Sequence, residues 1–248
     1  MNHLDYCDAL GAEITQFADV LATADFDDPV PGCPDWSVGD LAQHLGTVHR
    51  WAERLVANVA SERESPGAMG LVLEPVGSPW IREGGEQLLD TLRMSDPAAP
   101  MWTWGADQHL GWWSRRQLHE TLVHRIDLEA ASGITTDVAA PIAADAIDEF
   151  LVNLECAGAF SPLVREIRGS GEVLNILATD AQKSWSVALT PEGFTVGGRN
   201  EFGDAELSGP ALDLLVVLYR RLALSDSSVS ASGSRAIVDF WLAHSALE

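Results

Sequence analysis

Apolar residues recur at helical spacing through the first two thirds of the chain, and this periodicity limits the possible fold more than any other feature. One stripe covers residues 4–21 and a second covers 38–60. Apolar residues three and four positions apart mark the buried face of an amphipathic helix. Ser37 followed by Asp40 has the form of a capping box, which predicts the start of the second helix. Further helices are expected at 80–93, 112–132 and 141–158.

The pattern changes to shorter segments after about residue 165. Alternation of apolar and polar residues is typical of a strand that is buried on one side. Such strands are expected at 172–179, 184–189, 194–196 and 205–207. Pro210 begins the apolar stretch ALDLLVVLYRRLAL, which predicts a helix, and a last helix is expected at 235–244. The predicted fold class is α+β and mainly α, with a helical domain at residues 1–165 and a small α+β domain at residues 166–248.

The balance of charges excludes several classes of partner. The chain has 37 acidic and 15 basic residues, and the resulting net charge of −22 would repel nucleic acid and anionic membrane surfaces. A hydrophobic fraction of 46% argues against intrinsic disorder. No stretch approaches the roughly 20 apolar residues of a membrane span, and the first residues do not have the pattern of a signal peptide. We expect no nucleic-acid or membrane partner, and a monomer or a homodimer.

The cysteines indicate the compartment. Cys7, Cys33 and Cys156 are odd in number and widely spaced, and no CxxC pair occurs. This predicts neither a disulfide framework nor a cysteine zinc site. A reducing cytoplasm is the simplest location for such a chain.

The segment RRQLHETLVHRID, residues 115–127, holds the densest set of candidate metal ligands. It differs from the zinc-protease motif HExxH by one additional residue, so His119 and His124 lie about 140° apart around a helix and cannot share a metal ion. Glu120 and His124 are four residues apart and face the same way, which makes them half of a metal site. Asp127 lies on that face and could orient a ligand imidazole. The spacing of these residues therefore excludes a zinc protease of the HExxH type, but it remains compatible with another kind of metal site.

A third ligand has to come from another helix. His44 falls among Leu41, Leu45 and Val48, which mark the buried face of the second helix, and is therefore the candidate. His49 lies farther around the helix and is expected to be exposed or beside the ligands.

Simpler interpretations remain open on spacing alone. A buried histidine is more often hydrogen-bonded in the core than a metal ligand. Glu120 has potential salt-bridge partners in Arg116 and His124, and Asp127 has them in Arg125 and Arg116.

Three motifs resemble a known family. PDWSVGDLAQHLG at 34–46 resembles the metal-site helix of DinB-like four-helix bundles. RRQLHETLVHRIDLEAASG at 115–133 resembles the signature of the mycothiol-dependent maleylpyruvate isomerase family. SGPALDLLVVLYRR at 208–221 is similar to the C-terminal domain of that family, in which a helix ends in an arginine. The resemblance covers nearly the whole chain in the expected order, and it implies a DinB-like helical bundle followed by a small α+β domain.

The resemblance also implies cofactors and site residues. The family's zinc ligands fall on His44, Glu120 and His124, the residues that helix geometry also favours. Its active-site arginine falls on Arg221, although the family has Trp-Gly-Arg where this chain has Tyr219-Arg220-Arg221, so Arg220 becomes a candidate for cofactor binding. A mycothiol thiolate at the open zinc position would then add to a small electrophilic carboxylate such as maleylpyruvate. Loss of the thiolate after rotation is a cis–trans isomerisation, and retention makes a thiol transferase.

Two other functions compete with this one. Two histidines and one carboxylate also describe the facial triad of non-haem iron(II) oxygenases. A non-catalytic helical bundle that uses the metal for stability and binds a ligand or a protein partner is the third possibility.

Overall fold

The computed structural model describes residues 1–69, 71, 76–200 and 202–245. The chain divides into two compact units, Met1–Thr136 and Asp137–Glu248. Among the described residues, no helix combines the length and the apolar character that crossing a bilayer requires.

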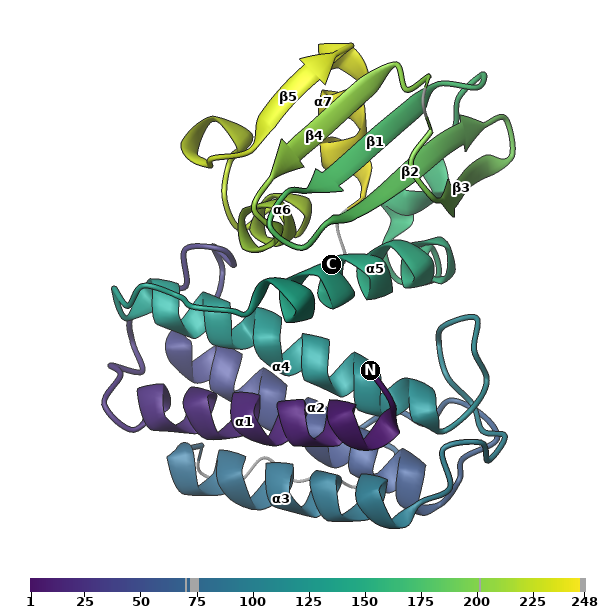
Figure 1. The fold of residues 1–248 in the computed structure, drawn as a ribbon. Coiled ribbons are helices and arrows are strands. Elements are labelled where there is room, and N and C mark those ends of the chain that lie inside the picture. The colour runs from purple at the N-terminus through teal and green to yellow at the C-terminus, as the bar shows by residue number, and fades with distance from the viewer. Residues whose placement is uncertain (70, 72–75, 201, 246–248) are drawn as a thin grey trace. The chain divides into compact units, whose positions relative to one another are not determined.

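The first unit is a bundle of long helices (Figure 1). Its members are α1 (His3–Leu21), α2 (Val38–Ala57), α3 (Ser78–Met94) and α4 (Gly111–Ala131). The predicted capping box begins α2: the Ser37 side chain accepts from the Asp40 amide at 3.2 Å, and the Asp40 carboxylate accepts from the Ser37 amide at 3.0 Å. Capping satisfies backbone donors that the helix leaves free, and so it determines where α2 begins.

Helix α4 is buried on almost all sides. It packs against α1 and α2, and its buried residues cover most of its circumference. Polar side chains on α4 are therefore taken out of water and need partners inside the protein. Close packing elsewhere in the bundle uses a glycine, because a Cβ at Gly46 on α2 would lie 1.9 Å from a ring carbon of Trp80 on α3. The sequence places these polar groups on α4, and the folded chain buries them.

The second unit combines three helices with a mixed five-stranded sheet of order β3-β2-β1-β4-β5. The strands are β1 (Val173–Ala178), β2 (Lys183–Thr190), β3 (Gly193–Gly197), β4 (Ala205–Gly209) and β5 (Ser230–Gly233). Strands β1 and β4 are parallel and the other neighbours are antiparallel. The helices are α5 (Ala140–Ala157), α6 (Ala211–Leu218) and α7 (Arg235–His244), and short 3₁₀ turns cover Pro162–Glu166 and Leu224–Asp226. The observed fold class is α+β and mainly α, as predicted.

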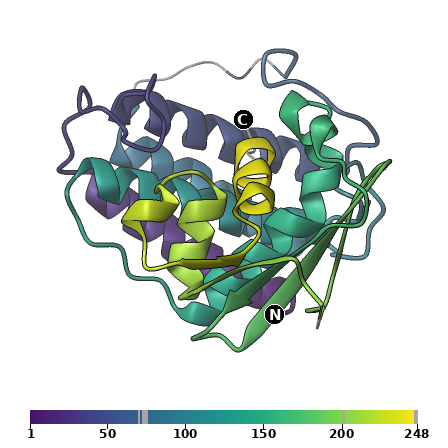
Figure 2. The same ribbon diagram turned by 90° about the horizontal axis from the view of Figure 1, so that it is seen from above.

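The helices of this unit cover one face of its sheet (Figures 1 and 2). Trp185, Val187 and Leu189 of β2 are buried on the covered face, as the period of two along a strand predicts. Phe194 of β3 packs edge to face against Trp241 of α7, with ring centroids 5.5 Å apart. The other face carries smaller and more polar side chains and no helix.

The observed units divide the chain earlier than the boundary between residues 165 and 166 that the sequence suggested. Helix α5 packs on α6 within the second unit, where the rings of Phe150 and Tyr219 are 4.9 Å apart. The Trp185 indole donates to the Asp148 carboxylate at 2.9 Å and ties β2 to α5. Helical periodicity shows that α5 is a helix, but it does not show which layer its apolar face covers.

Two further details differ from the expectations. The helix expected through ALDLLVVLYRRLAL ends at Leu218, because Arg220 has a left-handed backbone with φ of 58° and terminates the helix. Strand β5 was not predicted, since SASG at 230–233 is small, polar and exposed and shows no alternation.

Candidate metal centre

The structure brings together the three residues that helix geometry and family resemblance both indicated. His44 comes from α2, and Glu120 and His124 come from α4. One ligand atom from each lies within 4.8 Å of the others. Glu120 Oε1 is 3.2 Å from His44 Nε2 and 3.3 Å from His124 Nε2. His119 is also buried but is not part of this cluster, as expected from its angle on the helix.

Two of the three distances within the cluster match the spacing of ligand atoms around a metal ion, and the third pair lies within 4.8 Å. Zinc binds imidazole nitrogen and carboxylate oxygen at about 2.0–2.2 Å in a tetrahedron, so neighbouring ligand atoms lie about 3.3 Å apart. The two contacts of Glu120 Oε1, at 3.2 and 3.3 Å, match that spacing. The donor set of two imidazoles and one carboxylate suits zinc and several other divalent metals. The residues present therefore fit the metal that the family resemblance implies.

Hydrogen bonds and charge keep the Glu120 carboxylate ionised. Burial raises the pKa of Glu120, but hydrogen bonds with His124 and His44 and the charge of Arg116 outweigh burial and hold the pKa well below its ordinary value. For His124, burial lowers the pKa, while hydrogen bonds to Asp127 and Glu120 raise it to about 9. A metal ion that binds His124 Nε2 therefore displaces a proton.

Asp127 fixes the orientation of the His124 ring. Its Oδ2 lies 3.1 Å from His124 Nδ1, and the Asp127 side chain is only 1% exposed. A carboxylate at that distance accepts the Nδ1 proton, so the lone pair of the neutral ring is on Nε2, which faces the cluster. The orienting role that the sequence suggested for Asp127 agrees with this contact.

Trp36 lies against both imidazoles, and the sequence analysis did not identify it as part of the site. Its ring centroid is 4.9 Å from that of His44 and 6.2 Å from that of His124. The backbone around it is fixed, because the Trp36 amide donates to the Cys33 carbonyl at 2.9 Å and the Trp36 carbonyl accepts from the Val30 amide at 2.9 Å. Its position immediately before the N-cap of α2 was the available signal.

Comparison with known proteins agrees with these features. A family model described as the mycothiol maleylpyruvate isomerase N-terminal domain matches residues 7–129. The chain belongs to this family. The matched residues include all three members of the cluster. A search of curated protein sequences found no match.

Solved structures show that the likeness extends over the whole chain. The crystal structure of a histidine-to-alanine mutant of the mycothiol-dependent maleylpyruvate isomerase has a TM-score of 0.60 and 15% identity, covering 94% of this chain and 95% of that one. A second crystal structure, titled as the mycothiol-dependent maleylpyruvate isomerase, has a TM-score of 0.58 and 14% identity at the same coverage. At these identities the likeness concerns the fold, including both the DinB-like bundle and the α+β unit.

The residues Tyr219-Arg220-Arg221, which the resemblance aligns with Trp-Gly-Arg, follow the end of α6. The Arg220 amide donates to the Val217 carbonyl at 3.0 Å, and the Arg221 amide donates to the Val216 carbonyl at 2.8 Å. This pair of bonds is a Schellman motif, in which the left-handed residue is usually glycine. Arg220, with φ of 58°, is thus the left-handed residue of this motif, the place where glycine is most common. The side chain of Arg220 is exposed and that of Arg221 is half-buried.

His49 is buried near the three candidate ligands, whose charges act on its ring, so of its two expected places the exposed one is wrong. It is fully buried, and its Nε2 lies 2.9 Å from Thr121 Oγ1 on α4. Because Thr121 donates its proton to the Gln117 carbonyl at 2.7 Å, the His49 ring is the donor to Thr121. Burial lowers the pKa of His49 to about 3, so the ring is neutral in the folded protein.

Acid should therefore destabilise the protein through His49. The unfolded state binds a proton at His49 below its ordinary pKa of about 6.5, while the folded state excludes that proton down to about pH 3. The contribution of the neutral His49 ring to the free energy of unfolding is complete above pH 6.5. It decreases by about 1.4 kcal/mol per pH unit as the pH falls from 6.5 toward 3. Urea unfolding at several pH values measures how steeply the free energy of unfolding changes with pH. This slope should be smaller by about 1.4 kcal/mol per pH unit in His49→Gln. Equal slopes in the two proteins would contradict the assignment.

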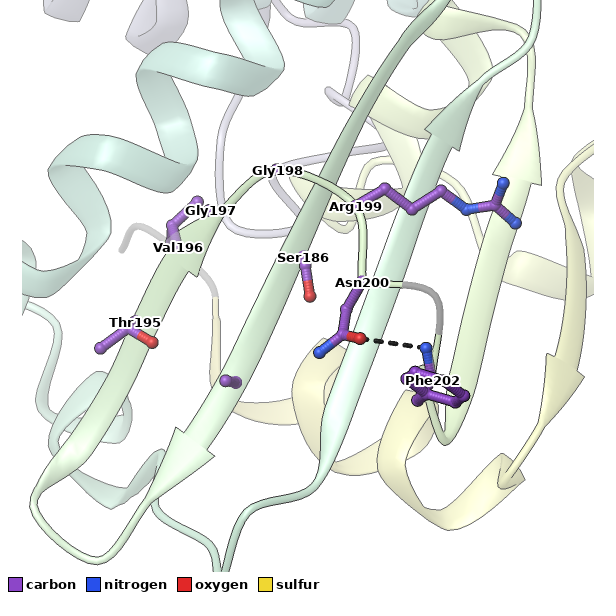
Figure 3. Close-up of a pocket in the computed structure, with 9 residues that line it drawn as sticks. Ser186, Thr195, Val196, Gly197, Gly198, Arg199, Asn200 and Phe202 are labelled. Atoms are coloured by element: carbon purple, nitrogen blue, oxygen red, sulfur yellow. Dashed lines mark hydrogen bonds between the residues drawn. The ribbon is translucent and has the colours of Figure 1, made fainter.

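A concavity lies on the face of the five-stranded sheet that its own unit's helices do not cover (Figure 3). It has a volume of about 470 Å³ and is lined by Ser186, Ala188, Thr195, Val196, Gly197, Gly198, Arg199, Asn200 and Phe202. The one charged residue in this lining, Arg199, is bound to Glu206 at 2.7 Å. The described residues that line this hollow include no histidine, cysteine, aspartate or glutamate.

Proposed function

We propose that this chain is a zinc-dependent enzyme that uses a low-molecular-weight thiol, mycothiol, for the cis–trans isomerisation of a small electrophilic carboxylate such as maleylpyruvate. The observation that carries the proposal is the convergence of His44, Glu120 and His124, whose ligand atoms lie within 4.8 Å of one another, with Glu120 Oε1 3.2 and 3.3 Å from the two imidazole nitrogens. Membership in the family and the names of the solved relatives support the choice of thiol and substrate.

Each residue of the candidate site would have its own role in this reaction. His44, Glu120 and His124 would hold the metal, and three protein ligands leave a position for a further group. A zinc ion held there would lower the pKa of a bound thiol and so favour the thiolate, the nucleophile that reversible addition to a conjugated double bond requires. Asp127 keeps the proton of His124 on Nδ1, and the Trp36 ring keeps water from one side of the imidazoles.

The experiment compares the zinc-loaded and metal-free proteins with mycothiol and maleylpyruvate, following substrate and products by chromatography. We expect conversion to the trans isomer only when both zinc and thiol are present, with no net consumption of thiol. Accumulation of a thioether product would instead assign a mycothiol S-transferase. Oxygen consumption by an iron-loaded protein would favour the oxygenase. A protein that binds metal and is stabilised by it but converts nothing would support the non-catalytic bundle.

Arg221 is proposed to bind the substrate carboxylate, on the basis of its place in the family motif. Charge-assisted hydrogen bonds contribute about 1.5–3 kcal/mol, so Arg221→Gln should lower kcat/KM about 10- to 100-fold, mainly through KM for the carboxylate.

Arg220 is proposed to bind the thiol cofactor through its exposed side chain. Arg220→Gly should leave the fold stable, since glycine tolerates the left-handed backbone, and should raise KM for mycothiol. Steady-state kinetics with each substrate varied in turn measures both effects. Unchanged KM values would remove both arginines from the site.

A further inference from the structure

The two oxygens of Glu120 have different environments. Oε1 faces His44 Nε2 and His124 Nε2, at 3.2 and 3.3 Å. Oε2 accepts a hydrogen bond from Arg116 Nη2 at 2.6 Å. Arg116 lies one turn before Glu120 on α4, so the helix itself sets the distance between the two side chains. One oxygen is thus directed at the candidate metal position and the other is held by a guanidinium.

The contact with Arg116 is buried. The side chain of Arg116 is 5% exposed, and its guanidinium lies 5.8 Å from the ring centroid of Trp104. Trp104 is held in turn against Trp112, with ring centroids 5.0 Å apart. A short charge-assisted bond that is shielded from water is stronger than an exposed ion pair and keeps its geometry. Arg116 and Trp104 therefore form a fixed support behind the carboxylate.

Helix stability does not explain this pair. An exposed ion pair four residues apart stabilises a helix by about 0.2–0.5 kcal/mol, and the arrangement with the acidic residue first is the more favourable one. Here the basic residue comes first, and the side chains of Arg116 and Glu120 are only 5% and 21% exposed. Burying two charges costs free energy that a surface pair of this kind does not recover. A role at the neighbouring ligand cluster is the better account.

We propose that Arg116 is a positioning residue that makes Glu120 a one-oxygen ligand and so keeps a coordination position open for the thiol. This rests on the proposed metal-dependent function. A carboxylate with two free oxygens can bind a metal through both, and the second oxygen would then occupy the position that the substrate thiol requires. The hydrogen bond from Arg116 removes Oε2 from that competition.

Cobalt(II) provides the test, because its visible absorption is strong in four-coordinate sites and weak at higher coordination numbers. Wild-type protein, Arg116→Met and Arg116→Lys would be loaded with Co²⁺ and titrated with 2-mercaptoethanol as a small thiol probe. We expect the wild type to show the strong spectrum. Arg116→Met should show a weaker spectrum and about tenfold lower affinity for the thiol, in the range found when groups that orient metal ligands are removed. Arg116→Lys, which keeps the charge, should move both values back toward the wild type.

The controls separate this proposal from the function on which it rests. Arg93→Met removes an exposed arginine that pairs with Asp8 in the same unit, and it should match the wild type in spectrum and thiol affinity. If the wild type binds Co²⁺ and Arg116→Met has the same spectrum and the same thiol affinity, Arg116 has no positioning role. If the wild type binds no Co²⁺, the metal centre itself is wrong and this proposal fails with it. Should Arg116→Met not fold, Arg116→Gln, which has no charge, takes its place with the same expected result.

Discussion

Glu120→Gln is expected to empty the metal centre while leaving the helices folded. The substitution keeps the size of the side chain but removes the charge that attracts the metal ion and pairs with Arg116. Metal content measured by mass spectrometry on protein purified without chelators should fall from about one ion per chain to near zero. Activity should fall about 100-fold or more, because a bound metal supplies several kcal/mol of stabilisation to the transition state.

Glu53→Gln is the matched control for this experiment. Glu53 is also a half-buried helical glutamate of the first unit, and it accepts a hydrogen bond from Thr91 at 3.0 Å, away from the metal cluster. It should retain metal and activity. A far-UV circular dichroism spectrum that is unchanged in both variants would show that the loss is local. Full metal content in Glu120→Gln would contradict the assignment of the ligands.

Arg125→Met is expected to produce the largest loss of stability. Arg125 is 1% exposed, and its Nε and Nη1 donate to Glu13 at 2.5 Å and to Glu129 at 2.6 Å, which joins α4 to α1. Without the guanidinium, two buried carboxylates lose their counter-charge. Removing one partner of a buried ion pair costs about 3–5 kcal/mol, which corresponds to a decrease in Tm of roughly 10 °C for a protein of this size.

Urea and thermal unfolding, followed by circular dichroism, measure this loss. Arg93→Met removes an exposed arginine and should change the free energy of unfolding by less than about 1 kcal/mol. A triple variant, Glu13→Leu with Arg125→Met and Glu129→Leu, removes all the buried charges together and should recover much of the stability. If Arg125→Met is no less stable than Arg93→Met, the network does not hold the bundle together.

Two of the three candidate metal ligands could be paired from local spacing in the sequence. Glu120 and His124 share a face of α4 because any helix places residues four apart on one side, whatever surrounds it. His44 could be nominated from its apolar neighbours, but its distance from Glu120, across 76 residues of sequence, depends on how α2 packs against α4. The resemblance to the family connected the two halves before the packing was known.

Other features had no local signal. Whether His49 is buried or exposed depends on α2 having neighbours on two sides, α3 and α4. The small residues of β5 pair with β4 only because the rest of the sheet is already in place. Helix α5 was predicted as a helix and yet belongs with the second unit, since its apolar face packs on α6.

Whether a feature could be predicted from the sequence depends on the range of the interactions that determine it. Helix starts, helical faces and the angle between Glu120 and His124 come from backbone hydrogen bonds and caps within a few residues, so they can be read from the order of the amino acids. Packing between segments distant in sequence brings His44 opposite Glu120 and places Trp36 against both imidazoles. Packing sums many weak contacts over the whole bundle, and no short pattern of residues encodes that sum.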